Sequence, residues 1–284
     1  MRFSYATIAL PTLEPRDAAA AVAAAGFRGI EWKVGEAPHA MGSPSEFFLQ
    51  GNRATIPLET GAGTRARDIA DEFALDVVGI APYVQIGDTA RLDRALELAV
   101  EAGAPQLRLQ GPRFTKGGPS YSTLFAETLS FLGEAERRAA DCGVRVVVEI
   151  HHNTIVSSAS LAHRLIGNFD PRLVGVIYDV GNMVFEGYED HRIGFDLLGP
   201  YVHHVHLKNG GVTRDASGRW RPTWTPLDDG VVRVDEFLAL LRTMGYTGWI
   251  SIEDLSTCRD PVETMSFNAE YLSRVAPEDW LARV

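Results

Sequence analysis

Residues 144–150 read VRVVVEI, a run in which five of seven side chains are Val or Ile. Residues 173–180, LVGVIYDV, repeat this pattern. Nearly continuous runs of this kind are typical of parallel strands, because both faces of such a strand are covered by other parts of the chain. The stretch between them, Ser157–Asn168, has helical spacing and can start from a serine cap. The three segments therefore predict one β–α–β unit.

The same alternation of strand-like and helix-like segments extends along the whole chain. The strand-like runs are residues 3–10, 29–34, 76–84, 105–111, 144–150, 173–180, 201–207 and 248–255. The helix-like stretches are Arg16–Ala25, Asp88–Ala102, Thr123–Asp141, Ser157–Asn168, Val234–Met244 and a last one from Pro261 towards Val275. Several of them stop at a glycine, which commonly ends a helix.

Repeated β–α alternation is compatible with either a doubly wound sheet or a closed barrel. The number of strand-like runs and a length close to the ~250 residues of a typical barrel favour the closed form. No linker, low-complexity tract or charge run marks a second domain. We therefore expect an α/β fold, a single-domain (β/α)8 TIM barrel over residues 1–284.

The composition limits the partners that this chain can bind. Of the 284 residues, 45% are hydrophobic, which predicts a sizeable buried core. The net charge of −10 argues against nucleic acid and anionic membranes, because both are held by clustered Lys and Arg. Cys142 and Cys258 make neither a disulfide framework nor a CxxC site. No signal-peptide pattern or run of ~18 apolar residues is present, so we expect a cytoplasmic protein.

Four ionisable residues stand near the carboxyl ends of four successive strand-like runs. They are Glu149, Asp179, His206 and Glu253. In a barrel, the strand ends converge on one rim, so side chains distant in sequence can meet around one point. Because buried carboxylates without a partner are very costly, three acids and a histidine call for a cation. The sequence therefore predicts a divalent metal site at this rim.

The seventh run continues as HHVHLKNG, residues 203–210. Since residues alternate faces along a strand, His204, His206 and Lys208 share one face and His203 lies on the other. If His206 faces the mouth of the barrel, Lys208 lies on the same side, one step further out. His203 then packs outward against helices. His204 lies deeper, either beside the metal ligands or as a hydrogen-bonded histidine of the core.

Two connections, Gly35–Gly63 and Asn209–Val232, are too long for plain turns. Both follow strands at the end where barrel enzymes build their sites, so they are either functional lids or tolerated insertions. Trp220 and Trp224 in the second connection can stack on a ligand, close a lid or pack against a neighbouring subunit. A dimer or a tetramer is consistent with the last alternative.

Several motifs resemble those of the sugar phosphate isomerase/epimerase superfamily, the xylose isomerase-like (β/α)8 barrels. They are EIHHNT (149–154), IYDVGNMVFEGYE (177–189), HHVHLKN (203–209) and GWISIED (248–254). GIEWKV (29–34) and LRLQGP (107–112) are similar to the second and fourth strands of that superfamily, so the resemblance spans nearly the whole chain. The superfamily includes ketose 3-epimerases, hydroxypyruvate isomerase, and inosose isomerases and dehydratases.

The resemblance implies that Glu149, Asp179, His206 and Glu253 bind one divalent cation. Mn²⁺ is typical of the superfamily, with Mg²⁺, Co²⁺ or Zn²⁺ as substitutes, and oxygen-rich ligation with one imidazole also suits Mn²⁺ or Mg²⁺. It further implies that Glu149 and Glu253 are the catalytic acid and base. One of them would remove the proton next to a carbonyl, giving an enediolate, and the other would return a proton.

Three more residues are candidates for substrate binding. Ketose 3-epimerases carry a histidine three residues after the metal-binding aspartate, whereas this chain has Asn182, which can donate or accept a hydrogen bond but cannot titrate near neutrality. That difference argues against a free-ketohexose 3-epimerase. By strand parity His151 shares the face of Glu149, where it either reaches the pocket or serves as a helix cap or core residue. Lys208 either anchors an oxyanion or is a solvated lysine at the strand end.

The resemblance therefore predicts a metal-dependent isomerase or epimerase of carbohydrate metabolism, acting on a small keto sugar or cyclitol. The alternative is a lyase that dehydrates an inosose or a 3-keto sugar, because the same two glutamates serve both outcomes. A nuclease of the same barrel fold would need more histidine ligands and a basic track for DNA. A barrel that binds a metabolite without turnover would be favoured by the loss of a ligand acid, but all four ligands are present.

Overall fold

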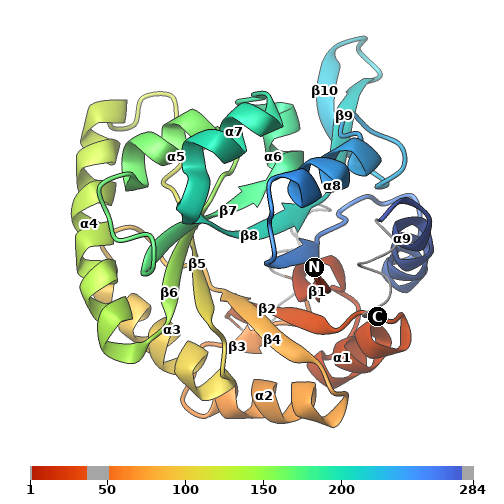
Figure 1. Cartoon of the computed structure of the whole chain (residues 1–284), viewed down its shortest axis with the longest axis horizontal. Coiled ribbons are helices and arrows are strands. Elements are labelled where there is room, and N and C mark those ends of the chain that lie inside the picture. Colours follow the sequence, from red (N-terminus) through yellow and green to blue (C-terminus); the bar gives the residue numbers. More distant parts are fainter. Residues whose placement is uncertain (1, 37–50, 277–284) are drawn as a thin grey trace.

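The structure is a computed structural model that describes residues 2–36 and 51–276. Eight parallel strands form its centre (Figure 1). They are β1 (Arg2–Ala6), β2 (Gly29–Gly35), β4 (Asp76–Ala81), β5 (Gln106–Gln110), β6 (Arg145–Glu149), β7 (Val174–Asp179), β8 (Val202–Leu207) and β11 (Trp249–Ile252). Pairing of β1 with both β2 and β11 closes the sheet into the expected (β/α)8 barrel.

Helices surround the barrel as an outer ring (Figure 1). They are α1 (Pro15–Ala24), α2 (Ala62–Glu72), α3 (Thr89–Ala102), α4 (Tyr121–Cys142), α5 (Ala159–Ile166), α6 (Val180–Phe185), α7 (His191–Leu198), α8 (Val234–Thr243) and α9 (Pro261–Val275). Short 3-10 helices lie at Thr7–Ala9 and Gly199–Tyr201. None of the described helices is long and apolar enough to cross a membrane.

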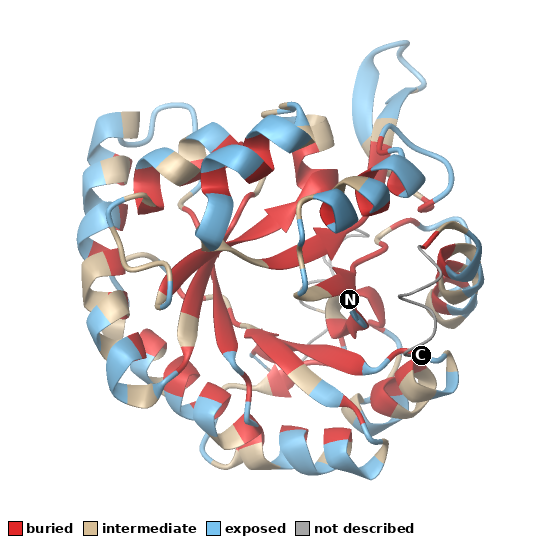
Figure 2. Cartoon of the chain, in the orientation of Figure 1, coloured by how far each residue is buried: buried red, intermediate tan, exposed pale blue. Residues whose placement is uncertain are grey.

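The elements form where local chemistry favours them. Side chains of Asp88, Ser120 and Ser158 accept hydrogen bonds from backbone N–H groups in the first turns of α3, α4 and α5. Gly103 and Gly143 end α3 and α4 in the left-handed conformation, which glycine adopts without steric cost. Figure 2 shows the barrel strands largely buried and the outward faces of the helices exposed.

All eight predicted strands are present, but several are shorter than the apolar runs. Residues 7–9, predicted as strand, form a 3-10 helix. Helices α2, α6 and α7 were not predicted from the sequence. The connection 209–232 is not irregular, because it contains an antiparallel hairpin of β9 (Asn209–Arg214) and β10 (Trp220–Thr225), which projects beyond the ring of helices (Figure 1).

The other long connection includes a two-residue strand, β3 (Ile56–Pro57), that pairs with the end of β2. Residues 37–50 of this connection lie outside the described residues, and so does any part they play as a lid. The hairpin β9–β10 is therefore the long insertion whose relation to the barrel mouth can be described.

Candidate metal centre and pocket

The four predicted ligands meet at the carboxyl end of the barrel. Nδ1 of His206 lies 3.4 Å from Oε1 of Glu149, 3.5 Å from Oδ2 of Asp179 and 3.8 Å from Oε2 of Glu253. One ligand atom from each residue lies within 4.8 Å of the others, and all four residues are buried. Strands β6, β7, β8 and β11 thus bring together the residues that sequence reasoning selected.

Backbone geometry explains how Asp179 is presented. In the pairing of β7 with β8, Asp179 stands opposite His206, so the two side chains leave neighbouring strands at one height. Oδ1 of Asp179 accepts a hydrogen bond of 2.9 Å from the backbone N–H of Asn182 and caps α6. Its other oxygen, Oδ2, faces the centre. The helix cap therefore fixes the rotamer of a candidate ligand.

His206 is held with one nitrogen towards the acids. Its Nε2 lies 3.0 Å and 3.1 Å from the two carboxylate oxygens of Glu31 on β2, so this nitrogen carries the proton and donates it. Nδ1 is buried, has no hydrogen-bond partner and faces three carboxylate oxygens. Burial lowers the pKa of His206, but Glu31, Glu253 and the other acids outweigh burial and raise this pKa well above its usual value. A positive charge between Nδ1 and the carboxylates, carried by a proton or by a metal cation, is therefore favoured. The donor set thus fits a divalent cation, with three oxygens and one nitrogen.

Lys208 reaches the same carboxylates. Its Nζ lies 2.8 Å from Oδ2 of Asp179 and 4.0 Å from Oε1 of Glu149, and it donates a hydrogen bond to Glu253. Burial lowers the pKa of Lys208, but the three carboxylates outweigh burial and raise the pKa above its usual value. The lysine side chain is therefore a buried cation of the site, not a solvated lysine at a strand end.

The two glutamates have opposite environments. Nε and Nη2 of the Arg108 guanidinium lie 2.6 Å and 2.5 Å from Oε2 of Glu149. Burial raises the pKa of Glu149, but Arg108 and other neighbouring cations outweigh burial and hold this pKa well below its usual value. Burial is also the largest influence on Glu253, and there it prevails over Lys208 and His206 and raises the pKa. The site thus pairs a carboxylate with a carboxyl group that holds its proton more tightly.

The centre opens into a pocket of about 690 Å³ that is lined by Glu149, Lys208 and Glu253. An aromatic wall covers one side of this pocket. The Trp224 ring of the hairpin lies 4.4 Å from Phe185 and 5.8 Å from His152 between ring centres. It also lies 5.2 Å from the ammonium group of Lys208.

The two tryptophans of the hairpin have different surroundings. Trp224 is half-buried and lines the pocket. Trp220 is 62% exposed, and within the described part of the chain its ring is covered by the guanidinium of Arg214 at 4.8 Å. Of the alternatives left open for this pair, contact with a ligand is therefore supported for Trp224 alone.

His151 and Asn182 both line the pocket. Nδ1 of His151 is hydrogen-bonded to the backbone oxygen of His152 at 2.7 Å, which leaves Nε2 as an acceptor, and burial lowers the pKa of His151 to about 4. The Asn182 amide donates to Oδ2 of Asp179 at 2.8 Å and accepts from His152 at 2.8 Å. Both the nitrogen and the oxygen of the Asn182 amide are therefore hydrogen-bonded to other residues of the protein. These contacts support a role in positioning Asp179, in addition to the predicted contact with substrate.

Sequence reasoning missed three charged residues of this site: Glu31, Lys33 and Arg108. They are 3%, 4% and 6% exposed and stand inside β2 and β5. The signal in the sequence was the presence of charged residues inside apolar runs: Glu31 and Lys33 in GIEWKV, and Arg108 in LRLQG. His204, predicted to lie deeper, donates from Nε2 to Glu31 at 3.0 Å and so belongs to the same hydrogen-bonded layer.

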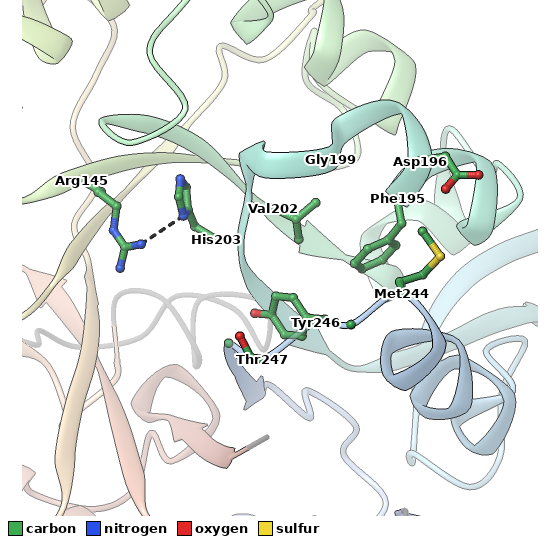
Figure 3. A pocket seen from close by; sticks show the side chains of 11 residues that line it. Arg145, Phe195, Asp196, Gly199, Val202, His203, Met244, Tyr246 and Thr247 are labelled. Atoms are coloured by element: carbon green, nitrogen blue, oxygen red, sulfur yellow. Dashed lines mark hydrogen bonds between the residues drawn. The ribbon is translucent and has the colours of Figure 1, made fainter.

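A second hollow lies at the opposite end of the strands. It measures about 480 Å³ and is lined by the starts of β6 and β8 and the turn before β11 (Figure 3). His203 points outward there as predicted, with Nη1 of Arg145 donating to its Nδ1 at 3.1 Å. No group of acids and histidines that could hold a metal is found there among the described residues. Because barrel enzymes react at the carboxyl ends of their strands, this hollow is not the candidate site.

The fold and the site define a (β/α)8 barrel protein with a candidate divalent-metal centre. The family model for the xylose isomerase-like TIM barrel matches residues 19–275, and the chain belongs to that family. An inosose dehydratase of Bacillus anthracis (strain CDC 684 / NRRL 3495) is 30% identical over 138 residues, which are 45% of this chain and 45% of that protein. The chain thus aligns with about half the length of the curated relatives that it matches.

Solved structures share the fold over almost the whole chain. A 3-keto-D-glucoside 4-epimerase from E. coli gives a TM-score of 0.71 at 16% identity, covering 96% of this chain and 99% of that chain. A probable 3-DHS dehydratase from Bacillus anthracis gives 0.71 at 19% identity with the same coverage. A xylose isomerase-like TIM barrel protein from Mycobacterium smegmatis, in complex with magnesium, gives 0.70 at 18% identity and covers 96% of both chains.

Proposed function

We propose that the chain is a divalent-metal-dependent isomerase or epimerase of a small keto sugar or related polyol ketone. The observation that carries the proposal is the buried cluster of Glu149, Asp179, His206 and Glu253, of which Glu149 and Glu253 line the pocket. A divalent cation held by these four residues would polarise a substrate carbonyl and stabilise the negative charge of an enediolate. The magnesium complex of the structural neighbour supports a cation at such a barrel.

The protein supplies the proton transfers. Glu149, whose pKa is held down through Arg108, is the base that takes the proton from the carbon next to the carbonyl. Glu253, whose pKa is raised by burial, is the acid that returns a proton. Environments that push the pKa values of two carboxyl groups apart are the usual arrangement for an acid–base pair.

Other residues of the pocket bind and orient the substrate. The ammonium group of Lys208 stabilises the oxygen that becomes negative in the enediolate. His151, neutral at pH 7, accepts a hydrogen bond from a substrate hydroxyl through Nε2. Trp224, which lines the pocket, covers the apolar face of the bound sugar. Asn182 orients Asp179 and also contacts the substrate.

A second candidate is a lyase that removes water from an inosose or a 3-keto sugar. It is favoured by the dehydratase names of the curated relatives and of one structural neighbour. The first half of the reaction is shared, because the same base removes the same kind of proton. The two candidates differ only in whether a hydroxyl group on the neighbouring carbon leaves.

The proposal has finer parts that follow from the same chemistry. Mn²⁺ is the native ion, the substrate is a small molecule of carbohydrate metabolism, and the protein works in the cytoplasm as a homodimer or homotetramer. Neither nucleic acid nor a membrane is a partner, which the net charge of −10 supports.

Solvent-exchange mass spectrometry tests the proposal. The Mn²⁺-loaded protein is incubated in deuterated water with a panel of ketoses, inososes and 3-keto sugars, and Glu149→Gln and Glu253→Gln serve as controls. We expect deuterium uptake with wild type and none with either variant. Unchanged mass apart from deuterium would identify an isomerase, and loss of water a lyase. A loaded wild type that exchanges no compound of the panel would contradict both candidates.

A further inference from the structure

The chain has three lysines among its 27 basic residues, and two of them are buried in the barrel. Lys208 is one, and its ammonium group is surrounded by carboxylates. Lys33 on β2 is the other, and it is 4% exposed. Lys116 is exposed, and no contact of its side chain is found in the described structure. The basic residues of the surface are thus almost all arginines, whereas two of the three lysines lie inside the barrel.

Lys33 differs from Lys208 in having no acidic partner among residues 2–36 and 51–276. Its Nζ donates a hydrogen bond of 3.0 Å to Oγ1 of Thr55. The ammonium group also lies 5.4 Å from the centre of the Tyr83 ring. In the described part of the chain, no carboxylate oxygen lies within 4.0 Å of it. A buried cation is costly unless it is paired, so this one lacks the partner that its burial calls for.

A small cavity of about 10 Å³ adjoins Lys33. Tyr83, Arg108 and Glu253 line this cavity as well as the larger pocket, so the two spaces are neighbours. A volume of about 10–15 Å³ accommodates one water-sized group. One carboxylate oxygen is of that size. A ligand in the main pocket can therefore place a single oxygen against Lys33 without opening the fold.

The buried charged residues near this cavity indicate which charge such a ligand would carry. The buried cations beside the metal centre are Lys33, Arg108 and Lys208. Arg108 and Lys208 are paired with carboxylates, whereas Nζ of Lys33 contacts the neutral hydroxyl of Thr55. A negatively charged group of a ligand would supply the partner that Lys33 lacks among the described residues.

We propose that Lys33, with Tyr83 beside it, forms an anion subsite that binds a carboxylate group of the substrate. The inference rests on the proposed function and narrows it to hydroxylated ketones that carry a carboxylate. A phosphate group fits less well, because the small cavity holds one oxygen and offers one ammonium group. Lys33 then fixes one end of the substrate while the metal centre holds the ketone at the other.

Matched ligands test the subsite without turnover. Calorimetric titrations of the Mn²⁺-loaded protein compare D-glucuronate with D-glucose, and quinate with myo-inositol, which are pairs with and without a carboxylate. We expect at least one of the acids to bind tenfold or more tightly than its neutral partner to wild type and to Lys116→Met. That preference should disappear in Lys33→Met. Equal binding within both pairs, or a preference unchanged in Lys33→Met, would overturn the subsite.

A structural role for Lys33 gives a different result in thermal melts. If the lysine only holds Thr55 and Tyr83, Lys33→Met melts at a lower temperature than wild type. If it is an unpaired buried cation kept for a ligand, Lys33→Met melts at a higher temperature while losing the preference for acids. A lower melting temperature would overturn the proposal.

Wild-type protein provides a measurement that needs no variant. With only three lysines, ¹³C-labelled lysine gives three Cε resonances, and the two buried ones are separated from Lys116 by their environment. We expect glucuronate or quinate to move the Lys33 resonance and the neutral partners to leave it in place. Deuterium exchange into an uncharged ketone, with no movement of the Lys33 resonance by acids, would uphold the proposed function and refute the subsite.

Discussion

At the scale of single residues, His206 shows how this site is assembled. Its Nε2–H is committed to Glu31, and Nδ1 therefore has to face three carboxylates. A carboxylate that accepts the distal N–H of a metal-binding imidazole fixes its tautomer and makes it a better ligand. Glu31 is thus inferred to position His206 without touching the metal or the substrate.

Removal of the Glu31 charge should weaken metal binding and leave the fold intact. Glu31→Gln keeps the shape but no longer holds the proton on Nε2 of His206, so we expect Mn²⁺ affinity to fall by about 10- to 100-fold. Calorimetric titration of the metal measures this, and circular dichroism checks the fold. Glu127→Gln, at an exposed glutamate, is the matched control. Unchanged affinity in Glu31→Gln would show that the hydrogen bond does not position His206.

Lys208 should compete with the metal for the carboxylates. Its ammonium group contacts Asp179 and Glu253, so these ion pairs have to rearrange when a cation binds. We expect Lys208→Met to bind Mn²⁺ about tenfold more tightly, a change of ~1.4 kcal/mol, and to lose most of its turnover. Metal titration and steady-state kinetics measure the two effects. Weaker metal binding in Lys208→Met would contradict competition.

The pKa of Lys33 leads to a pH-dependent stability. Burial, with a contribution from Arg108, lowers this pKa from 10.5 to about 8, so the folded state loses its proton before the unfolded state does. Below pH 8 both states hold the proton and the full cost of burial is present. Between about pH 8 and 10.5 the unfolded state binds more protons, so stability rises with pH. At pH 7, burial of the charged Lys33 side chain lowers the free energy of unfolding by ~3 kcal/mol.

Lys33→Met should therefore be the more stable protein at pH 7, by about 2 kcal/mol once the lost contacts with Thr55 and Tyr83 are allowed for. The difference from wild type should shrink as the pH rises from 8 to 10.5. Urea unfolding of both proteins at a series of pH values measures it. If Lys33→Met were less stable than wild type at pH 7, or if the difference in stability did not depend on pH, the predicted cost of burying the Lys33 charge would be contradicted.

The residues predicted from the sequence are those at the ends of strands. Glu149, Asp179, His206 and Glu253 could be selected because each interrupts an apolar run where a barrel opens. Glu31 and Arg108 could not be assigned in the same way, since a charge inside a strand has no meaning until its partner strand is known. Glu31 acquires its role from His204 and His206, 173 and 175 residues away in the sequence.

At the scale of elements, the hairpin β9–β10 completes the pocket. It starts directly after β8, and the pairing of Asn209 with Thr225 brings Trp224 back beside Lys208. The sequence predicted a long connection here but not the hairpin, because glycines at 210 and 211 and a proline at 222 weaken any strand pattern. Helix α6 was missed for another reason: it has only six residues and depends on the Asp179 cap.

The two tryptophans of this hairpin should respond differently to mutation. Trp224→Ala removes a wall of the pocket, and we expect KM to rise by about tenfold or more, in line with the ~1.5–3 kcal/mol carried by a buried aromatic side chain. Trp220→Ala, at the exposed end of the same strand, should change KM by less than about twofold and is the matched control. Kinetics on the substrate found by deuterium exchange measure both. Equal effects of the two substitutions would show that the hairpin acts as a whole and not through Trp224.

At the scale of the whole molecule, metal binding should be coupled to folding. The four ligands lie in or directly after four strands and are spread over residues 149–253, so the centre exists only in the closed barrel. Mn²⁺ at a hundred times its Kd should raise the free energy of unfolding by ~2.7 kcal/mol. Chelation should reverse this, and Asp179→Asn should lose most of the response. Thermal melts with and without metal measure it, and stability indifferent to Mn²⁺ in wild type would contradict the coupling.

The most direct test of the central claim is a crystal structure of the Mn²⁺-loaded protein with anomalous diffraction measured at the manganese edge. We expect one strong peak bonded to Nδ1 of His206 and to oxygens of Glu149, Asp179 and Glu253, with Nε2 of His206 still hydrogen-bonded to Glu31. A peak among Glu31, His204 and His206, the other buried group with suitable ligand atoms, would contradict the assignment. The absence of any peak at the four-residue centre in loaded crystals would contradict the metal site itself.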